Sequence, residues 1–535
     1  MKEFTRLYTE LDQTNKTNEK VEALRNYFAE AGPADAAWAF YFLSGRKPRQ
    51  IVPAAKLRSW AIEAAGIPEW LYQESRDTVG DSAETIALLL PDIAGIDETP
   101  LHILVQEKLL PLRGADEAIQ KAAVLSAWGQ MNYPQRLVFN KLISGAFRVG
   151  VSQQLVVRAI SELTEIPSDV LSHRAMGDWQ PTAEFYLQLT GHHDESVEMP
   201  ISRPYPFHLA HQIEGRPEDL GDIGQWQAEW KWDGIRAQVI RRGEEVFIWS
   251  RGEDLITERF PEIAAAAAKL PVGTVLDGEI LAERAGRVLP FTELQRRIGR
   301  KHLTPKILDE LPAVLEVYDL LEFEGRDIRE LEFSTRRRML EEHLAVDGGP
   351  IRLTESVSAT DWESLAETRE KSRLLGVEGL MLKRRSSPYR VGRHRGDWWK
   401  WKIDPMTVDA VLIYAQKGSG KRSNLFTDYT FAVWNEGKLV TFAKAYSGLT
   451  DAEIRRVDRY VRANTIETFG PVRSVVPQLV FEIGFEAMQR SARHRSGVAV
   501  RFPRILRWRE DKAPEEADSL QTIYKMLAAF QDPAE

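Results

Sequence analysis

The spacing of apolar residues changes once along this 535-residue chain, close to residue 200. Before that point apolar residues recur every three or four positions, as in Leu57, Trp60 and Ala64, which is typical of amphipathic helices. From Gln225 onwards, short apolar runs end at glycine, aspartate or proline, which is typical of strands. Because a chain of this length cannot bury one core, we expect a multi-domain protein that begins with an all-α domain over residues 1–200.

Two further domains are expected after a proline-containing linker. Residues 205–403 combine apolar strands with helices at 335–344 and 360–375, which indicates an α+β domain with antiparallel sheets. Residues 404–535 contain short strands at 410–414, 429–434, 439–445 and 479–485, with one helix at 451–463. That content is typical of a small closed β-barrel.

Composition narrows the class of protein. The chain has no cysteine, which excludes disulfides and thiolate metal sites and fits a cytoplasmic protein. We find no signal-peptide pattern and no run of about 20 apolar residues, so no membrane partner is expected. A net charge of −8 argues against nucleic-acid binding by the whole surface, but local basic patches remain able to bind it.

The stretch Glu229-Trp-Lys231-Trp-Asp233-Gly234 places a lysine between two tryptophans in a predicted strand. Burying an unpaired ammonium is costly, so this lysine is a poor choice for a core strand. It suits a nucleophile, because desolvation and neighbouring cations favour the neutral amine. We expect Gly234 to let the backbone approach a ligand. Taken alone, the pattern is also compatible with an exposed strand end.

Charged residues recur on the strands of the middle region, and their cations outnumber their acids, as expected of a pocket for a polyanion. They are Lys231, Asp233, Arg236, Arg251, Glu279, Glu378, Lys383, Lys400 and Lys402. Glu279 and Glu378 are oxygen donors that suit Mg²⁺, and Tyr318 offers a ring on which a base can stack. Each charged residue of this set could instead be a solvated surface charge. That interpretation does not explain why all of them lie in or beside apolar, strand-like segments.

These residues lie in ordered motifs that resemble those of the covalent nucleotidyltransferases, which include ATP-dependent DNA ligases, RNA ligases and mRNA capping enzymes. The motifs are Lys231-Trp-Asp-Gly-Ile-Arg236, Ser250-Arg251-Gly-Glu253, Asp277-Gly-Glu279, Tyr318-Asp319, Glu378-Gly-Leu-Met-Leu-Lys383 and Trp398-Trp-Lys400-Trp-Lys402. The tail, Arg501-Phe-Pro-Arg504 and Arg509-Glu-Asp511-Lys512, resembles the last motif of DNA ligases. The helical region around Phe147-Arg148-Val149-Gly150 resembles their DNA-binding domain.

The resemblance implies an ATP-dependent DNA ligase with an adenylation domain at 205–403 and an OB-fold barrel at 404–535. Lys231 would carry AMP, Lys400 and Lys402 would neutralise the α-phosphate, and Asp233 would contact a metal or the 3′-hydroxyl. The implied ATP contacts are Glu229, Arg236, Arg251, Glu279, Tyr318, Lys383, Arg504, Arg509, Asp511 and Lys512. Glu279 and Glu378 would hold Mg²⁺.

Nicked duplex DNA is the implied partner of a monomer, with DNA repair proteins as further partners. Basic residues expected to contact phosphates are Arg148, Arg384, Arg385, Arg390, Arg393, Arg395, Arg490, Arg493 and Arg495. Two alternatives remain at this point. One is an RNA ligase or capping-type guanylyltransferase that uses the same lysine, and the other is a catalytically idle DNA-binding scaffold.

Overall fold

The computed structural model describes residues 1–46, 50–93, 95–145, 147, 149–191, 201–300, 303–344, 349–418 and 424–531. The chain divides into two compact units: Met1–Val156 with Asp404–Glu535, and Val157–Ile403. The division falls inside one helix, so the two helices that follow it belong to the unit that holds the central sheets. Within the described residues, no helix combines the length and the apolarity needed to cross a membrane.

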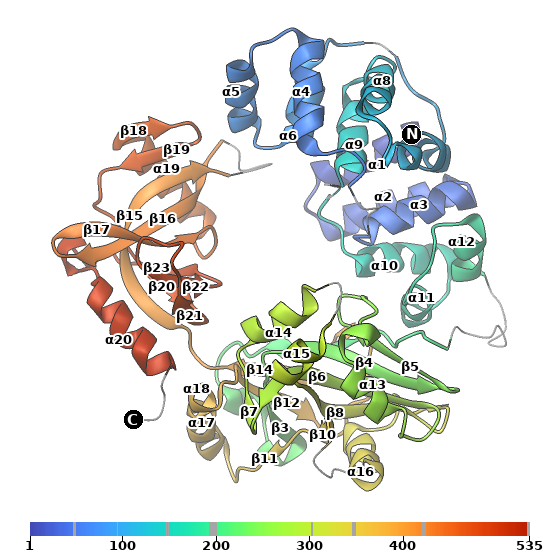
Figure 1. Ribbon diagram of the computed structural model, residues 1–535, viewed down its shortest axis with the longest axis vertical. Helices are drawn as coiled ribbons and strands as arrows, with labels where there is room; N and C mark the ends of the chain where they lie inside the picture. Colours follow the sequence, from blue (N-terminus) through green and yellow to red (C-terminus); the bar gives the residue numbers. More distant parts are fainter. Residues whose placement is uncertain are drawn as a thin grey trace. The chain divides into compact units, whose positions relative to one another are not determined.

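The N-terminal region is helical (Figure 1). Its core includes an aromatic cluster in which the rings of Phe4 and Phe147 stack with centroids 5.6 Å apart. Asn132 caps one helix by accepting a hydrogen bond from the backbone of Gln135, and Gly145 ends that helix in the left-handed conformation. The helices are α1 (Lys2–Gln13), α2 (Thr17–Glu30), α3 (Pro33–Leu43), α4 (Ala54–Ala65), α5 (Glu69–Val79), α6 (Ser82–Leu89), α7 (Leu101–Ile103), η1 (Leu104–Leu109), η2 (Leu110–Leu112), α8 (Glu117–Trp128), α9 (Tyr133–Ser144), α10 (Gln153–Thr164), α11 (Ser168–Arg174) and α12 (Ala183–Thr190).

The middle region is built on two sheets. The larger has the strand order β10-β8-β6-β4-β5, with β7 paired to β6 and β9 to β8; the smaller has the order β11-β3-β12-β14-β2. Their strands are β2 (His211–Gln212), β3 (Trp226–Trp230), β4 (Ile235–Arg242), β5 (Glu245–Ser250), β6 (Thr274–Arg284), β7 (Arg287–Val288), β8 (Ala313–Phe323), β9 (Arg326–Asp327), β10 (Ile351–Leu353), β11 (Ser356–Val357), β12 (Gly379–Arg384) and β14 (Trp398–Lys402). Strands β1 (His208–Leu209) and β13 (Gly392–Arg393) form a separate pair, and η3 (Pro217–Leu220) and η4 (Ile223–Gln225) precede β3.

Helices cover the outer faces of these sheets. Apolar residues of α13, α14 and α16 join the core of the larger sheet, and those of α17 join the core of the smaller one. A third cluster contains Ile240 and Leu321 of the larger sheet together with Trp398 of the smaller one, so the two sheets pack against each other. The helical elements are η5 (Thr257–Arg259), α13 (Pro261–Ala267), α14 (Phe291–Ile298), α15 (Pro305–Glu310), α16 (Phe333–His343), α17 (Trp362–Glu370) and α18 (Ser372–Leu375).

The C-terminal region contains a sheet with the strand order β17-β16-β15-β19-β18. Strand β20 pairs with β15 and with β23, and β21 and β22 form a separate hairpin. One continuous core contains residues from β15, β16, β17 and β20 and from the helices α19 and α20. The elements are β15 (Met406–Lys417), β16 (Phe426–Asn435), β17 (Lys438–Ala445), α19 (Asp451–Ala463), β18 (Thr465–Phe469), β19 (Val472–Val475), β20 (Val480–Phe485), β21 (Ala487–Arg490), β22 (Val498–Arg501), β23 (Arg504–Trp508), η7 (Pro514–Glu516) and α20 (Leu520–Gln531).

The helical, sheet-rich and strand-rich regions follow the predicted order, with differences in detail. Three short pairings are parallel, namely β1 with β13, β10 with β8 and β14 with β2, because these strands return to the sheets through long connections. The helix predicted at 360–375 is two helices, α17 and α18. Helix α20 was not predicted.

Candidate active site

Three charged residues meet where strands of the smaller sheet end. Lys231 directly follows β3, Glu378 directly precedes β12, and Lys402 is the last residue of β14. In the antiparallel register Leu380 lies opposite Trp230 and Gly379 lies opposite Lys402. The backbone extends this pairing, because Lys231 N donates to Gly379 O at 2.9 Å and Glu378 N donates to Lys231 O at 2.8 Å.

The side chains of these three residues form an ion-paired group. Lys231 Nζ lies 2.5 Å and Lys402 Nζ lies 3.2 Å from the same oxygen, Glu378 Oε2. Burial raises the pKa of Glu378, but the two ammonium groups outweigh burial and hold that pKa below its usual value. Lys231 keeps 21% of its side-chain surface exposed, so a ligand can still reach its nitrogen.

Two glycines let the strands around this group approach closely. A Cβ on Gly379 would lie 2.3 Å from the carbonyl oxygen of Trp401, and its φ of +136° disfavours any other residue. A Cβ on Gly234 would lie 2.3 Å from the carbonyl oxygen of Ile280 in β6. We expected Gly234 to make room for a ligand, but its nearest neighbour is this strand of the other sheet.

Glu279 faces the group from β6. Its Oε1 accepts a hydrogen bond from the backbone N–H of Gly234, at 3.2 Å. Burial raises the pKa of Glu279 to about 7, against the opposing effects of Lys231 and Arg236. The second proposed metal ligand is therefore close to half-protonated at neutral pH.

Arg236 is held tightly between the sheets. Its guanidinium donates to both oxygens of Asp277, at 3.2 and 2.7 Å, and to the carbonyl of His208 at 2.6 Å. Asp277 has no exposed surface and also accepts from Tyr389 and Tyr318. Burial opposes the charge of Arg236, but Asp277 raises its pKa above the ordinary value. Asp277 and Tyr389 organise this part of the site, although no role was predicted for either of them.

Lys383 lies beneath the predicted base-stacking residue. Its Nζ is 2.6 Å from Glu229 Oε2 and 4.1 Å from the centre of the Tyr318 ring. The side chain of Lys383 is 1% exposed, and burial lowers its pKa in spite of Glu229. Arg337 lies 3.5 Å from Glu229, so this carboxylate has two cations beside it.

The remaining predicted residues of this site lie at its edge. Arg251 is exposed after β5, and its backbone N–H donates to the carbonyl of Arg236 at 2.9 Å. Asp233 is partly buried in the connection from β3 to β4, which joins the two sheets. Lys400 lies in β14, where burial and the charges of Arg393, Lys231 and Lys402 lower its pKa. The site therefore concentrates positive charge.

The tail residues form their own group in the C-terminal region. Arg509 and Lys512 both donate to Asp409 Oδ2, at 2.8 and 2.6 Å, and Arg509 also pairs with Asp511 at 2.7 Å. Arg504 pairs with Glu486 at 2.8 Å. Nothing in the sequence pointed to Asp409, because it lies in an apolar strand a hundred positions before its partners.

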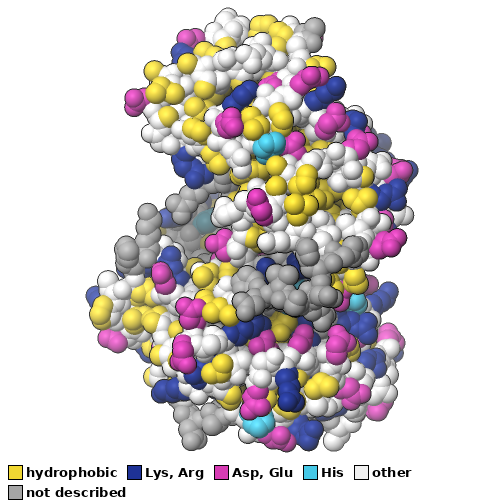
Figure 2. Space-filling model, turned by 90° about the vertical axis from the view of Figure 1, so that its right-hand side faces the viewer, with side chains coloured by type: hydrophobic (Ala, Val, Ile, Leu, Met, Phe, Trp, Pro, Cys, Tyr) yellow, Lys and Arg dark blue, Asp and Glu magenta, His cyan; other side chains and the backbone are white. Residues whose placement is uncertain are grey.

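The arginines predicted to contact DNA differ in their surroundings. Arg384 is tied into the fold: it donates to Gly396 O at 2.8 Å and lies over the Trp226 ring at 4.5 Å. Arg385, Arg390, Arg393 and Arg395 are exposed, and Arg390 lies 3.4 Å from Asp397. Arg148 is outside the described residues. On the face in Figure 2, basic and acidic side chains are interspersed rather than gathered by sign.

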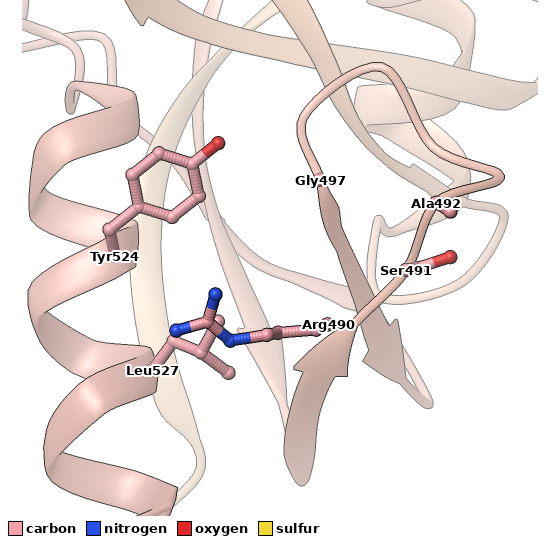
Figure 3. Close-up of a pocket in the computed structure, with 6 residues that line it drawn as sticks. All are labelled: Arg490, Ser491, Ala492, Gly497, Tyr524 and Leu527. Carbon is pink, nitrogen blue, oxygen red and sulfur yellow. The ribbon is translucent and has the colours of Figure 1, made fainter.

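The second predicted basic cluster lies at the end of β21 and on the loop that leads to β22. Arg490 extends towards α20 and lines a pocket of about 470 Å³ with Tyr524 and Leu527 (Figure 3). Ser491, Ala492 and Gly497 of the loop form the other wall. Arg493 and Arg495 are exposed on the same loop.

The two carboxylates fit the chemistry of Mg²⁺ when a substrate supplies the other ligands. No group of three or more acids or histidines in the described ranges could hold a metal alone. Mg²⁺ commonly binds one or two carboxylates together with substrate phosphates and water. Glu378 is ionised and Glu279 can ionise near neutral pH, so both donors suit such a site.

Comparison with known proteins gives the family. Residues 1–188 match the model of the DNA ligase N terminus, residues 208–402 that of the ATP dependent DNA ligase domain, and residues 422–512 that of the ATP dependent DNA ligase C terminal region. A probable DNA ligase of Koribacter versatilis is 32% identical, over 95% of this chain and 93% of its own length. DNA ligase 1 of Korarchaeum cryptofilum is 27% identical, over 99% of each chain.

A solved structure described as Pmar-Lig_PreS3 has the same fold, with a TM-score of 0.58 at 16% identity, over 95% of this chain and 99% of that one. The chain belongs to the ATP-dependent DNA ligases, which seal nicks in DNA through a lysyl-AMP intermediate. ATP is therefore its substrate, and DNA ligation is favoured over RNA ligation, capping and an idle scaffold.

Proposed function

We propose that Lys231 is the residue that receives AMP. In this first step Lys231 Nζ bonds to the α-phosphorus of ATP, the bond from that phosphorus to the pyrophosphate oxygen breaks, and the ammonium loses a proton. The supporting observation is the convergence of Lys231, Glu378 and Lys402 at the ends of three neighbouring strands. Of the described lysines near this group, only Lys231 stands two residues before an Asp-Gly pair, as in the motif that carries the nucleophile.

Charged neighbours surround Lys231. Its Nζ contacts Glu378, which Lys402 contacts as well. Attack requires Lys231 to leave this contact and to give up a proton, because an amine attacks only when it is neutral. Lys400 and Lys402 then stabilise the charge that develops on the α-phosphate. Tyr318 stacks on adenine, and Arg236, Arg251, Lys383 and the backbone of Glu229 complete the nucleotide pocket.

Sealing follows in two further transfers. AMP passes from Lys231 to the 5′-phosphate of the nick, and the 3′-hydroxyl then bonds to that phosphorus while AMP leaves. Glu279 and Glu378 would hold Mg²⁺, which when bound offsets phosphate charge. We assign Asp233 to the metal or to the 3′-hydroxyl side of the site.

The tail serves the first step, because pyrophosphate is present only then. Arg504, Arg509, Asp511 and Lys512 orient it, which requires the C-terminal domain to change position between steps.

We propose that this domain, residues 404–535, is an OB-fold, supported by its curled sheet and single core. Residues 1–200 and 205–403 are the proposed DNA-binding and adenylation domains. We further propose that the protein is a monomer, acts in the cytoplasm and is recruited by DNA repair proteins.

Radioactive labelling tests the central assignment. Incubation with α-labelled ATP and Mg²⁺ is expected to leave label on the protein after denaturation, and Lys231→Ala is expected to abolish it. Lys269→Ala, at an exposed lysine after α13, is the matched control. Pre-adenylated nicks are expected to be sealed by Lys231→Ala at least in part. Undiminished label on Lys231→Ala would refute the assignment.

A further inference from the structure

Asp409 is a buried carboxylate that holds two cations of the tail. It lies in β15 with 8% of its surface exposed. Its Oδ2 accepts hydrogen bonds from Lys512 Nζ at 2.6 Å and from Arg509 at 2.8 Å. Its Oδ1 is buried and has no hydrogen-bond partner among the described residues. Removing one partner from a buried ion pair leaves an uncompensated charge, so the three side chains hold one another in place.

The segment that follows the tail fixes the position of Asp409. The backbone N–H of Asp409 donates to Asp518 Oδ2 at 2.8 Å, and the N–H of Asp518 donates to the carbonyl of Asp409 at 2.8 Å. Asp518 precedes α20, whose residues Leu520 and Ile523 lie in the domain core. This anchor lies beyond residue 512, where the matched family segment ends.

The two cations are held to different degrees. Arg509 is 14% exposed and is shared between Asp409 and Asp511, with two short hydrogen bonds to the latter. Lys512 is 29% exposed, and among the described residues Asp409 is its ion-pair partner. Arg509 is therefore fixed from two sides, whereas Lys512 needs to break one contact to reach another anion.

We propose that Asp409 is a positioning residue for the first step, which holds Arg509 and Lys512 in place for the pyrophosphate of ATP. The inference rests on the proposed role of the tail in that step. While no pyrophosphate is bound, the carboxylate of Asp409 stands in for a phosphate and keeps the cations of Arg509 and Lys512 close together. Lys512 then exchanges the carboxylate for a phosphate oxygen, and Arg509 stays fixed. Preorganisation of this kind removes the cost of ordering both long side chains during the reaction.

The test uses Asp409→Asn in the full-length protein, since asparagine keeps the size and the backbone pairing with Asp518 but removes the charge. Single-turnover assays would measure adenylation with α-labelled ATP and, separately, sealing of pre-adenylated nicks. We expect adenylation to slow about tenfold or more, and sealing to stay within about twofold of the parent. Asp428→Asn, which removes a carboxylate paired with Lys444 at 3.1 Å in the same domain, is expected to change neither rate.

A double variant separates positioning from general structure. If Asp409 acts through the cations, Asp409→Asn combined with Lys512→Ala adenylates within about threefold of Lys512→Ala alone. Multiplied losses in the double variant, or an equal loss in both steps for Asp409→Asn, would overturn the proposal. If Asp409→Asn adenylates at the parental rate while Lys512→Ala adenylates slowly, the inference about Asp409 is refuted and the proposed role of the tail stands. If Lys512→Ala adenylates normally, the role of the tail fails and the inference fails with it.

Discussion

Lys231 Nζ and Glu378 Oε2 lie 2.5 Å apart, although 147 positions separate the two residues in the sequence. Strand β12 brings them together because it pairs with β3 on one side and β14 on the other. Glu378 thereby touches both the proposed nucleophile and Lys402. One carboxylate thus joins two cations that are carried by the ends of different strands.

Glu378→Ala is therefore expected to impair both steps. Its loss leaves the ammonium groups of Lys231 and Lys402 without their shared counter-charge and removes a proposed metal ligand. We expect adenylation and sealing of pre-adenylated nicks to slow by about a hundredfold or more in single-turnover assays. Glu370→Ala, at an exposed residue of α17, is the control. Retention of either step at the parental rate would contradict the shared role of Glu378.

Glu279 predicts a pH dependence of stability. Its pKa is about 7 in the folded protein and about 4.5 when exposed, so folding favours the protonated form. Stability from this residue is complete below about pH 4.5 and is lost as the pH rises towards 7. Glu279→Gln cannot ionise, so we expect its melting temperature to fall less than that of the parent between pH 5 and pH 8. Parallel curves for the two proteins would show that Glu279 is not the residue responsible.

The basic loop around β13 offers a test of DNA contacts. Arg393 and Arg395 are exposed, whereas Arg384 is bonded to Gly396 and packs on Trp226. Replacing Arg393 and Arg395 by alanine is expected to weaken nick binding and reduce the slope of log affinity against log salt by about 2. Arg384→Ala is expected to lower the melting temperature instead. An unchanged salt slope in the double variant would exclude these two contacts.

The boundary of the adenylation domain is a further prediction. His173 in α11 stacks on Tyr205 with ring centroids 5.0 Å apart, and Arg329 lies 4.1 Å over the same Tyr205 ring. We expect a fragment of residues 157–403 to melt several degrees above one of residues 205–403, because the shorter fragment exposes this cluster. Thermal unfolding by circular dichroism measures the difference. Equal melting temperatures would show that α11 and α12 contribute nothing to that fold.

The elements whose signals are local could be predicted from the sequence. Helix α19 spans Asp451–Ala463 as expected, because Thr450 and Glu453 form a capping box and apolar residues follow at helical spacing. Lys231, Glu378 and Lys402 stood out because charged residues are costly in apolar strands. Their convergence required only that neighbouring strands pair.

Features that depend on distant partners could not be predicted. Asp409 resembles any acid in a strand until β15 and the tail are seen together. Arg384 and Arg393 have the same side chain, and only tertiary contacts make one structural and leave the other exposed. Helix α20 was missed although its signal is local, since Leu520, Ile523 and Leu527 recur at helical spacing.

The close approach at Gly379 limits how this enzyme can be re-engineered. A single methyl group there would collide with Trp401 O and with Lys402 Cα, at 2.3 and 2.7 Å, and so would push away the strand that carries one of the three charges. In a library that samples every position, we expect residue 379 to accept glycine alone, even though its side chain takes no part in the reaction. The loop at 385–397 joins the same two strands and is constrained as well, because Tyr389 within it donates a hydrogen bond to Asp277.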